Sequence, residues 1–574
     1  MVFIEGKSAS PGISSGRAFI YKQQDLSFET EKINDVQVES KRLHDAFNLA
    51  SGELLEIKNS LSGDLGEEYG HIFRAQMTMV EDEEFLNEII EIIEEEKLCA
   101  EGSLKTIFDG YSEAFSSLGE DDYNRQRLAD LADVYSRILR ILLGLPDTNL
   151  SGVPAGSIVI AEDLMPSDTA LMNRENVKGL ITEKGGVTSH VAILSKSLGI
   201  PAAVGTAKAV SQTTAGDEVL LDSRNFEKAS IWIKPGQAEK LSFTKELKSH
   251  EEKTALISEM KGKEAITLDG KKIELSANIG SLEDLENALS FGAKSVGLLR
   301  TEFFFLGTKT QPDEEKQFVF YKKAAERLNP GMLVIRTLDI GGDKEVGCFE
   351  LPKEDNPFLG LRGIRVSIKY HEVFKTQLRA IVRASAFGNI KVMFPMIADV
   401  SELIYAKKLI SEIYDELKTE GKDFNPDMEI GTMVETPAAV FIADLLTEVG
   451  DFISIGTNDL TQYVLCADRI NENVSEYYRM FSPALIRAIK SASDAALKNG
   501  KWTGVCGELG GVAIAIPLLI GIGIGELSMT GGMLPEAVSI IRNLNYSDCK
   551  KAADKVLLMK TEEEIKAFLQ ANFA

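Results

Sequence analysis

The sequence predicts a multidomain α/β protein that ends in a (β/α)8 barrel of the TIM type. The chain has 574 residues, which is too long for a single hydrophobic core. After residue 265, short β-type runs alternate with helical runs to the end of the chain, as they do in a parallel sheet. Near the N-terminus and again after residue 154, β-type runs flank a long helical segment. These observations indicate a small α/β domain with an inserted α-helical bundle, followed by the barrel.

The small α/β domain is predicted from residues 1–24 together with 148–232. Its β-type runs and its one clear helix are Arg17–Tyr21, Ser157–Ala161, Gly179–Thr182, Glu218–Asp222 and the helix Val191–Leu198. The inserted bundle is predicted over 25–147, because apolar residues there repeat with the period of a helix face. The clearest such repeat is Leu86, Ile89, Ile90 and Ile93.

The barrel is predicted over 264–574, after a helical linker at 233–263 that is rich in Lys, Glu, Ser and Thr. Eight candidate strands fall in about 300 residues, which is the size of a (β/α)8 barrel. These strands are Ile273–Ile279, Ser295–Leu299, Leu333–Leu338, Lys391–Met396, Glu429–Val434, Phe452–Gly456, Trp502–Val505 and Glu526–Met529.

The composition limits the classes of function. The formal net charge of −25 disfavours nucleic acid and anionic membranes, and it favours a partner with a basic face. The five cysteines are far apart and form no CxxC pair, which argues against disulfides and fits a reducing cytoplasm. Glu5 and Lys7 interrupt any secretory signal. The longest apolar run, Gly510–Gly525, is too short to span a membrane and predicts a buried helix.

Polar side chains gather where the predicted barrel strands end. In (β/α)8 barrels, chemistry lies at the carboxyl ends of the strands. Five strands run into charged, amide or thiol side chains, namely Arg300, Thr301 and Glu302; Arg336 and Asp339, followed by Gly341–Lys344; Glu435; Asn458 and Asp459; and Cys506–Glu508. One polar strand end means little, but five at one rim predict an active site.

Arginines and carboxylates dominate this set. The planar guanidinium group suits carboxylate and phosphate, so several arginines could converge on a small anion. The candidates are Arg300, Arg336, Arg362 and Arg469. Glu435 and Asp459 would repel each other when ionised, and Mg²⁺ held by one or two carboxylates plus substrate oxygens would remove that repulsion. The alternative for any single residue is a structural salt bridge, whereas the whole set favours an anion and metal site.

Cys506 has two interpretations. A lone cysteine is usually a small buried hydrophobe. This one follows a predicted strand and precedes Gly507 and Glu508, so its thiol could instead donate a proton to carbon at the rim. Taken alone, its position favours the buried hydrophobe.

His190 lies between a glycine-rich loop, Gly185–Ser189 (GGVTS), and an apolar helical run. Paired glycines allow a tight turn, and Thr188 or Ser189 can cap the helix. In the first helical turn, the helix dipole keeps the imidazole neutral and nucleophilic, and free N–H groups bind a phosphoryl group. The commoner role of a histidine near a helix start is a surface or capping residue. The other four histidines show no comparable setting.

Further motifs extend along nearly the whole chain. The loop around His190 reads GGVTSHVAILSKSLGIPAAVGT, and SASPGISSG and DLMPSDTA precede it. The barrel contains GLLRTEFFF, VIRTLDIGGDKE, NPFLGLRGIR, MVETPAA, SIGTNDLTQY and WTGVCGEL. Together these segments resemble Enzyme I of the bacterial sugar phosphotransferase system. The resemblance implies that the small domain is a swivelling phosphohistidine domain. It also implies transfer of the phosphoryl group of phosphoenolpyruvate to the enzyme's own histidine, with release of pyruvate.

The resemblance assigns roles to the candidate residues. It makes His190 the phosphorylated nucleophile, with Thr169 near it. Glu435 and Asp459 would hold Mg²⁺. Cys506 would protonate the enolate as pyruvate forms, which reverses its interpretation as a simple hydrophobe. The residues implied to bind phosphoenolpyruvate are Arg300, Arg336, Arg362, Asn458, Asp459 and Arg469.

The resemblance also implies partners. The phosphoryl group would pass to a histidine of the small phosphocarrier protein HPr, which would dock on the helical bundle. There Glu67, Glu68 and the acidic run at 81–84 supply negative charge. Members of the family are homodimers that associate through the barrel, so the resemblance implies a homodimer here. The cytoplasmic location is expected from the cysteines.

Three positions depart from the family pattern. The usual GGRTSH is GGVTSH here, with Val187 in place of a basic residue. In the bundle, Gln76 replaces a common histidine, and Ala132 replaces a frequent arginine. These departures affect the expected choice of partner and strength of docking, and they leave the barrel chemistry unchanged.

Three alternatives remain open at this point. A phosphoenolpyruvate synthase or pyruvate phosphate dikinase shares the histidine domain and the barrel, but it needs a large ATP-binding domain that the first 150 residues do not resemble. A nitrogen-regulatory relative carries an extra N-terminal sensory domain, for which we see no room. A non-catalytic scaffold on the same fold would not need the full set of strand-end residues.

Overall fold

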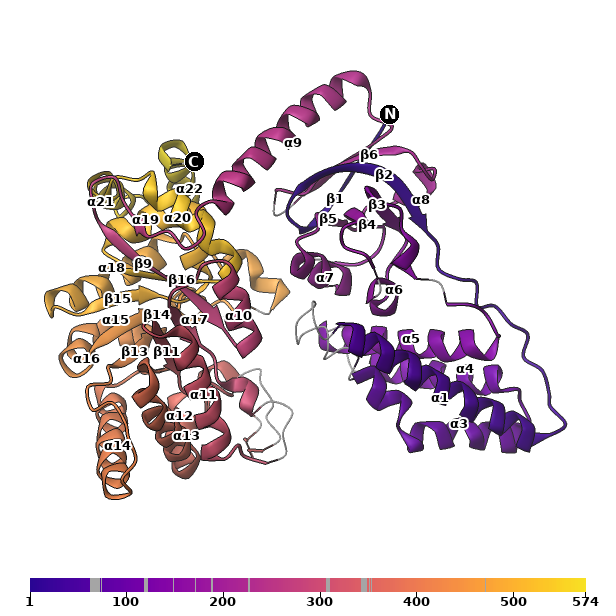
Figure 1. Cartoon of the computed structure of the whole chain (residues 1–574), viewed down its shortest axis with the longest axis horizontal. Helices are drawn as coiled ribbons and strands as arrows, with labels where there is room; N and C mark the ends of the chain where they lie inside the picture. Colours follow the sequence, from indigo (N-terminus) through magenta and orange to yellow (C-terminus); the bar gives the residue numbers. More distant parts are fainter. Residues whose placement is uncertain are drawn as a thin grey trace. The chain divides into compact units, whose positions relative to one another are not determined.

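The computed structural model describes residues 1–573 except 62–72, 74, 118–121, 148, 171, 187–188, 226–227, 306–309, 342–347, 350, 353 and 470 (Figure 1). The chain divides into two compact units, Met1–Glu252 and Lys253–Ala574. The predicted finer boundaries inside these units stay predictions. In the part of the chain that the structure describes, no helix is both long enough and apolar enough to cross a membrane.

The first unit contains a closed β-barrel in the strand order β1-β5-β4-β3-β2-β6-β7. The strands are β1 (Val2–Ser10), β2 (Ile13–Tyr21), β3 (Ser157–Ala161), β4 (Val177–Thr182), β5 (Ala202–Val204), β6 (Glu218–Asp222) and β7 (Ala229–Ile233). Strands β2 and β3 pair in parallel, with Arg17 opposite Ser157. The two β-rich segments on either side of the helical insertion therefore share one sheet, as the sequence predicts.

Helices of the insertion pack around one apolar core. They include α1 (Val36–Leu61), α3 (Glu83–Glu96), α4 (Ala100–Ser117) and α5 (Asp122–Leu142). The predicted apolar stripe of α3 is confirmed, since Ile89 and Ile93 are buried. Leu194 of α7 (His190–Leu198) also belongs to this core, whereas Val191 and Ala192 of the same helix pack against the β-barrel. Helix α7 thus lies between the bundle and the sheet.

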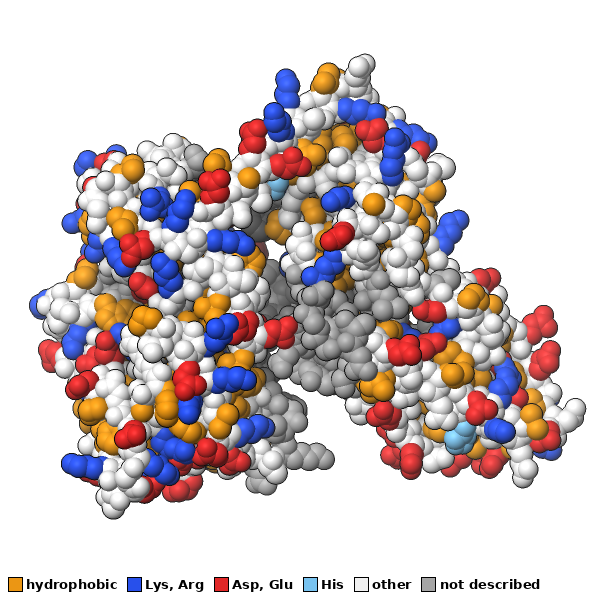
Figure 2. All heavy atoms as spheres, viewed as in Figure 1, with side chains coloured by type: hydrophobic (Ala, Val, Ile, Leu, Met, Phe, Trp, Pro, Cys, Tyr) orange, Lys and Arg blue, Asp and Glu red, His pale blue; other side chains and the backbone are white. Residues whose placement is uncertain are grey.

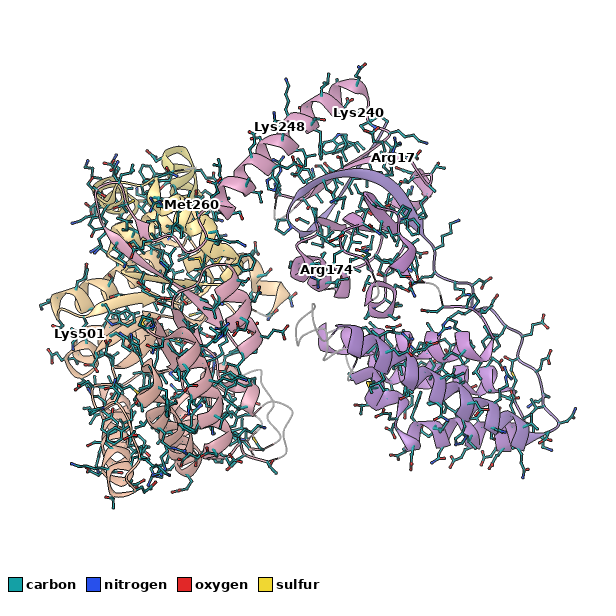
Figure 3. The ribbon with its side chains drawn as sticks, viewed as in Figure 1. Arg17, Arg174, Lys240, Lys248, Met260 and Lys501 are labelled. Carbon is teal, nitrogen blue, oxygen red and sulfur yellow. The ribbon has the colours of Figure 1, made fainter. Side chains whose placement is uncertain are left out.

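Helix α9 (Gln237–Ser258) forms the predicted helical linker, and the boundary between the two units falls within it. Most of its side chains are exposed, but Phe243 is buried and packs edge-on against Trp232. Lys240 and Lys248 project from α9 (Figure 3), and the Lys240 Nζ lies 2.5 Å from Glu218 Oε2 on β6. The first part of the linker is therefore anchored to the first unit.

The second unit contains the predicted barrel of eight parallel strands, closed by β9 between β16 and β10. The strands are β9 (Lys272–Ile279), β10 (Val296–Leu299), β11 (Met332–Arg336), β12 (Asn389–Phe394), β13 (Ile430–Val434), β14 (Phe452–Ile455), β15 (Trp502–Val505) and β16 (Glu526–Met529). Strand β8 (Ala265–Ile266) adds an antiparallel pair to β9. The strand predicted at Lys391–Met396 corresponds to β12, which ends at Phe394. It ends there because Pro395 has no backbone N–H to donate to a neighbouring strand.

Helices surround this barrel and alternate with its strands (Figure 1). The helices of at least eight residues are α10 (Leu282–Ser290), α11 (Glu314–Leu328), α13 (His371–Ala384), α14 (Val400–Thr419), α17 (Thr457–Leu465), α18 (Pro483–Lys498), α20 (Leu534–Arg542), α21 (Tyr546–Val556) and α22 (Glu562–Phe573). Helix α19 (Ile516–Ile522) is buried along its whole length. This confirms that the long apolar run is a core helix.

Side chains that point into the barrel alternate with those that point outward. Val334, Met433 and Cys506 belong to one apolar cluster inside the barrel. Arg336 and Glu435 each lie two residues beyond a member of this cluster, so they point inward at the carboxyl ends of β11 and β13. Arg336 and Glu435 therefore both lie at the rim where these strands end.

Glu526 is a fully buried carboxyl group inside the barrel. Burial raises the pKa of this carboxyl from 4.5 to about 8. Because the folded-state pKa exceeds the unfolded-state value, the protein takes up a proton at Glu526 when it folds. The contribution of this proton uptake to the free energy of unfolding is complete at low pH and is lost as the pH rises through about 8.

Replacing Glu526 with Gln removes this ionisation. We expect the free energy of unfolding of the variant, relative to wild type, to rise by roughly 1.4 kcal/mol per pH unit between about pH 5 and about pH 8. Calorimetry of the barrel's unfolding transition across this pH range measures the difference. A difference that does not change with pH would contradict the assignment of a raised pKa.

Candidate active site

Arg336 is held inside the rim by two carboxylates. Its guanidinium lies 2.6 Å from Glu302 Oε1 and 2.9 Å from Asp339 Oδ2. The Arg336 Nε is buried and has no hydrogen-bond partner. Because buried polar groups are usually satisfied, this free donor indicates a place for an anionic ligand.

Arg362 bridges two further carboxylates. It donates through Nε and Nη2 to Asp339, at 3.1 and 3.2 Å, and through Nη1 and Nη2 to Asp459, at 2.9 and 3.1 Å. Burial lowers the pKa of Arg362, but Asp339 and Asp459 outweigh burial, so the pKa is raised and the group stays cationic. Asp339 therefore joins both arginines into one buried network.

Glu435 lies beside this network and accepts a hydrogen bond from the Met396 backbone N–H, at 2.6 Å. Burial raises its pKa, the negative charges of Asp459 and Asp339 raise it further, and Arg336 and Arg362 oppose them. Two buried carboxylates that repel each other in this way would be stabilised by a cation.

The donor set of Glu435 and Asp459 fits a hard divalent cation that takes its remaining ligands from substrate and water. No group of three or more His, Cys, Asp or Glu side chains among the described residues forms a ready metal cage.

The other predicted binding residues lie at the edge of the network. Arg469 is half-buried, and its Nη1 is 3.9 Å from Asp459 Oδ1. Asn458 exchanges two hydrogen bonds with Glu508, of 3.1 and 2.9 Å. Arg300 follows β10 but is exposed, and its side chain makes no ion pair with the described residues. The predicted set is thus brought together around Arg336, Arg362 and Asp459, with Arg300 outside the buried part.

Cys506 is buried directly after β15. Its Sγ lies 3.7 Å from the Ile455 carbonyl oxygen. Burial raises the pKa of this thiol to about 12, and the Ser454 hydroxyl opposes that rise. The thiol is therefore protonated at neutral pH, as a proton donor must be.

Gly185, at the start of the loop before His190, has a φ of 91°, which favours glycine and suits a tight turn. Helix α7 begins at His190, with Ser189 at the N-cap position. The predicted capping hydrogen bond is wrong for Ser189, whose hydroxyl makes no cap bond. Val187, Thr188 and the side chain of His190 lie outside the described residues. Thr169 of α6 (Pro166–Ala170) is buried, and its hydroxyl donates to the Pro166 carbonyl at 3.0 Å.

The helical bundle carries acidic side chains on its surface (Figure 2). Residues 81–84, at the start of α3, are all exposed. Glu67 and Glu68 lie outside the described residues. Gln76 is fully buried and donates to Asp133 at 3.0 Å, so this departure from the family pattern lies in the bundle's core and not on a docking surface. Ala132 is half-buried.

Two functional carboxylates were placed at the rim by sequence but given no role. Glu302 orients Arg336, and Asp339 orients both Arg336 and Arg362. Tyr463, which contacts Arg362 through its hydroxyl at 3.4 Å, was missed. The signal for Tyr463 is its position one helical turn after Asp459 on α17, which puts both on one face. The loop at 342–347 after Gly341 lies outside the described residues.

Family comparisons match three descriptions in order along the chain. "PEP-utilising enzyme, N-terminal" matches residues 5–127, "PEP-utilising enzyme, mobile domain" matches 153–225, and "PEP-utilising enzyme, PEP-binding domain" matches 254–546. The barrel with its buried arginines lies in the last of these segments. Fold and site are thus those of an enzyme that uses phosphoenolpyruvate.

Curated relatives narrow this class. The chain is 40% identical over 570 residues to a phosphoenolpyruvate-protein phosphotransferase of Priestia megaterium, covering 99% of each chain. It is 41% identical over 571 residues to the enzyme of the same name from Haemophilus influenzae, covering 99% of this chain and 98% of the other. A solution structure of an Enzyme I protein is 34% identical, covers 43% of this chain and 99% of that chain, and has a TM-score of 0.39.

The chain belongs to the phosphoenolpyruvate-protein phosphotransferase family. It is an enzyme that moves the phosphoryl group of phosphoenolpyruvate to protein. The full-length match decides against the synthase and dikinase alternative.

Proposed function

We propose that the phosphoryl group moves from phosphoenolpyruvate at the barrel rim to His190, and from His190 to a histidine of the carrier protein HPr. The observation that carries this proposal is the pair of buried arginines held by carboxylates beside Glu435. This arrangement combines fixed positive charge for a phosphate with oxygen donors for a cation. The start of α7 at His190 supports the acceptor, since its free N–H groups stabilise a bound phosphoryl group.

Each barrel residue has a proposed role. Arg336 and Arg362 bind the phosphate and neutralise charge as the phosphoryl group leaves, with Arg300, Asn458 and Arg469 completing the site at the open edge. Glu435 and Asp459 would hold Mg²⁺, which when bound neutralises phosphate charge. Cys506 donates its thiol proton to the enolate carbon, which yields pyruvate. Thr169 helps to orient the histidine loop.

The partners follow from the same reasoning. HPr would bind the exposed acidic start of α3 and its surroundings, since a basic carrier surface complements it. We propose a homodimer that forms through the barrel domain. We place the enzyme in the cytoplasm, which fits its five free cysteines. The four-part division at 1–24 with 148–232, 25–147, 233–263 and 264–574 is part of this proposal, with α9 as the element about which the histidine domain swings.

Transfer to a carrier tests this function. The purified protein, phosphoenolpyruvate, Mg²⁺ and an HPr are mixed, and phosphorylated HPr and pyruvate are measured. We expect both products in equal amounts, and neither when Mg²⁺ is replaced by a chelator. Pyruvate formation without phosphorylated HPr would contradict the proposed acceptor, and carrier phosphorylation that needs ATP would contradict the proposed donor.

A further inference from the structure

Glu526 lies inside the barrel one layer of side chains below Cys506. Ser454 of β14 pairs with Gly504 of β15, and Gly504 pairs with Glu526 of β16. Gly504 is two residues before Cys506, so both positions face the barrel interior. A Cβ on Gly504 would lie 2.3 Å from Glu526 Oε2 and 3.4 Å from Ser454 Oγ. The absence of a side chain at 504 therefore makes room for the carboxyl and the hydroxyl beside it.

The Glu526 carboxyl has no cationic partner that accounts for its burial, and the neighbouring group that most favours its ionisation is the Ser276 hydroxyl. Its Oε1 has no hydrogen-bond partner, and it forms no ion pair in the described part of the chain. The charged groups that face it are Glu274, which disfavours its ionisation, and Lys391, which favours it. The Lys391 Nζ is already bound to Glu429 at 2.7 Å. Burying an acid without an ion-pair partner costs free energy, and a role in the reaction would account for this cost.

We propose that Glu526 is the proton source that restores the Cys506 thiol after each turnover, through the Ser454 hydroxyl. This inference rests on the proposed role of Cys506 as the proton donor to carbon. In the first step, the enolate carbon takes the thiol proton, which leaves pyruvate and a thiolate. In the second, Ser454 gives its hydroxyl proton to the thiolate and takes one from the Glu526 carboxylic acid. The Glu526 carboxylate then takes a proton from solvent.

The acidities run in the required order. Burial raises the pKa of Glu526 to about 8 and that of Cys506 to about 12. At neutral pH the carboxyl is therefore protonated, and it is a stronger acid than the thiol, so the proton moves toward the thiolate. Glu274 pairs in register with Glu526, is half-buried and lines a surface cavity of about 110 Å³, which provides a route from solvent.

Isotope exchange separates proton supply from the rest of the reaction. The full protein is mixed with Mg²⁺, phosphoenolpyruvate and ¹⁴C-labelled pyruvate in D2O. Exchange of carbon label between pyruvate and phosphoenolpyruvate reports phosphoryl and proton transfer at the site. Deuterium in phosphoenolpyruvate reports exchange of the thiol proton with solvent. Carbon exchange can continue when the same proton moves back and forth between Cys506 and the substrate carbon. Deuterium uptake into phosphoenolpyruvate requires that the thiol proton be replaced from solvent, which is the step that the relay supplies.

In Glu526→Gln we expect carbon exchange to persist and deuterium uptake per carbon exchange to fall by about 100-fold, which is typical for loss of a general acid. Ser454→Ala should show the same loss. Glu286→Gln, which removes a carboxyl group of α10 that pairs with Arg327, should keep both rates.

Unchanged deuterium uptake per carbon exchange in Glu526→Gln and Ser454→Ala would overturn the relay. An equal fall of both rates would also overturn it, because that is what a structural role predicts. Carbon exchange at the wild-type rate in Cys506→Ala would instead show that Cys506 is not the proton donor to the enolate carbon, on which this inference rests. Absence of carbon exchange in the wild type would contradict the proposed function itself.

Discussion

The His190→Ala variant should receive no phosphoryl group from phosphoenolpyruvate, and it should still bind phosphoenolpyruvate. The nucleophile is expected on α7 of the first unit, whereas the buried arginines that bind the substrate belong to the second. Removing the imidazole therefore takes away the acceptor and leaves the anion site intact. Nucleophilic catalysis has no substitute when its nucleophile is deleted, so carbon exchange between pyruvate and phosphoenolpyruvate should also be lost.

The measurement is intact mass after incubation with phosphoenolpyruvate and Mg²⁺, with calorimetric titration of phosphoenolpyruvate as the binding assay. His44→Ala is the matched control, because His44 is an exposed histidine of the bundle and should be phosphorylated like the wild type. Phosphorylation of the His190→Ala protein would contradict this prediction, because it would mean that another residue accepts the phosphoryl group.

The Arg362→Met variant should lose both activity and stability. Arg362 is buried and makes hydrogen bonds to Asp339 and Asp459 on separate strand ends. Without it, both carboxylates stay buried beside Glu435 with less compensating charge. Breaking a buried ion pair typically costs about 3–5 kcal/mol. The second-order rate constant for phosphorylation by phosphoenolpyruvate should fall by about 100-fold or more, since fixed charges at a phosphoryl group usually contribute this much.

Arg379→Met separates the two effects. Arg379 also pairs with three carboxylates, those of Glu314, Glu416 and Glu420, but on the outer helices of the barrel. It should lose some stability and keep the wild-type phosphorylation rate. Rapid-quench measurement of phosphorylated protein gives the rate constants. An Arg362→Met protein that folds and reacts at the wild-type rate would remove the arginine from the site.

Much of the barrel could be predicted because the local sequence pattern identifies its strands. Trp502–Val505 and Glu526–Met529 are short β-type runs between helices, and they match β15 and β16 residue for residue. The closed sheet of the first unit was harder to predict. Strand β5 has only 3 residues, and it pairs antiparallel with β1, which is far away in the sequence. Such pairing leaves no local pattern.

The sequence predicts which residues belong to the candidate site, but not which of them form ion pairs with one another. Strand ends identified Arg336, Glu435 and Asp459 as rim residues. Asp339 pairs with both Arg336 and Arg362. This pairing depends on how the segment that carries Arg362 folds back onto the strand ends, and no spacing in the sequence reveals that. Glu526 was missed because an acid at the start of a strand usually points to solvent. Only the register with Gly504 shows that it faces the interior.

Locating the phosphoryl group shows whether His190 is the acceptor. The wild-type protein is incubated with phosphoenolpyruvate and Mg²⁺, digested at alkaline pH, where phosphohistidine survives, and its peptides are sequenced by mass spectrometry. We expect a single acid-labile phosphoryl group on His190, with one pyruvate released for each group bound. A phosphoryl group on another residue, or pyruvate release without any phosphorylated protein, would contradict it.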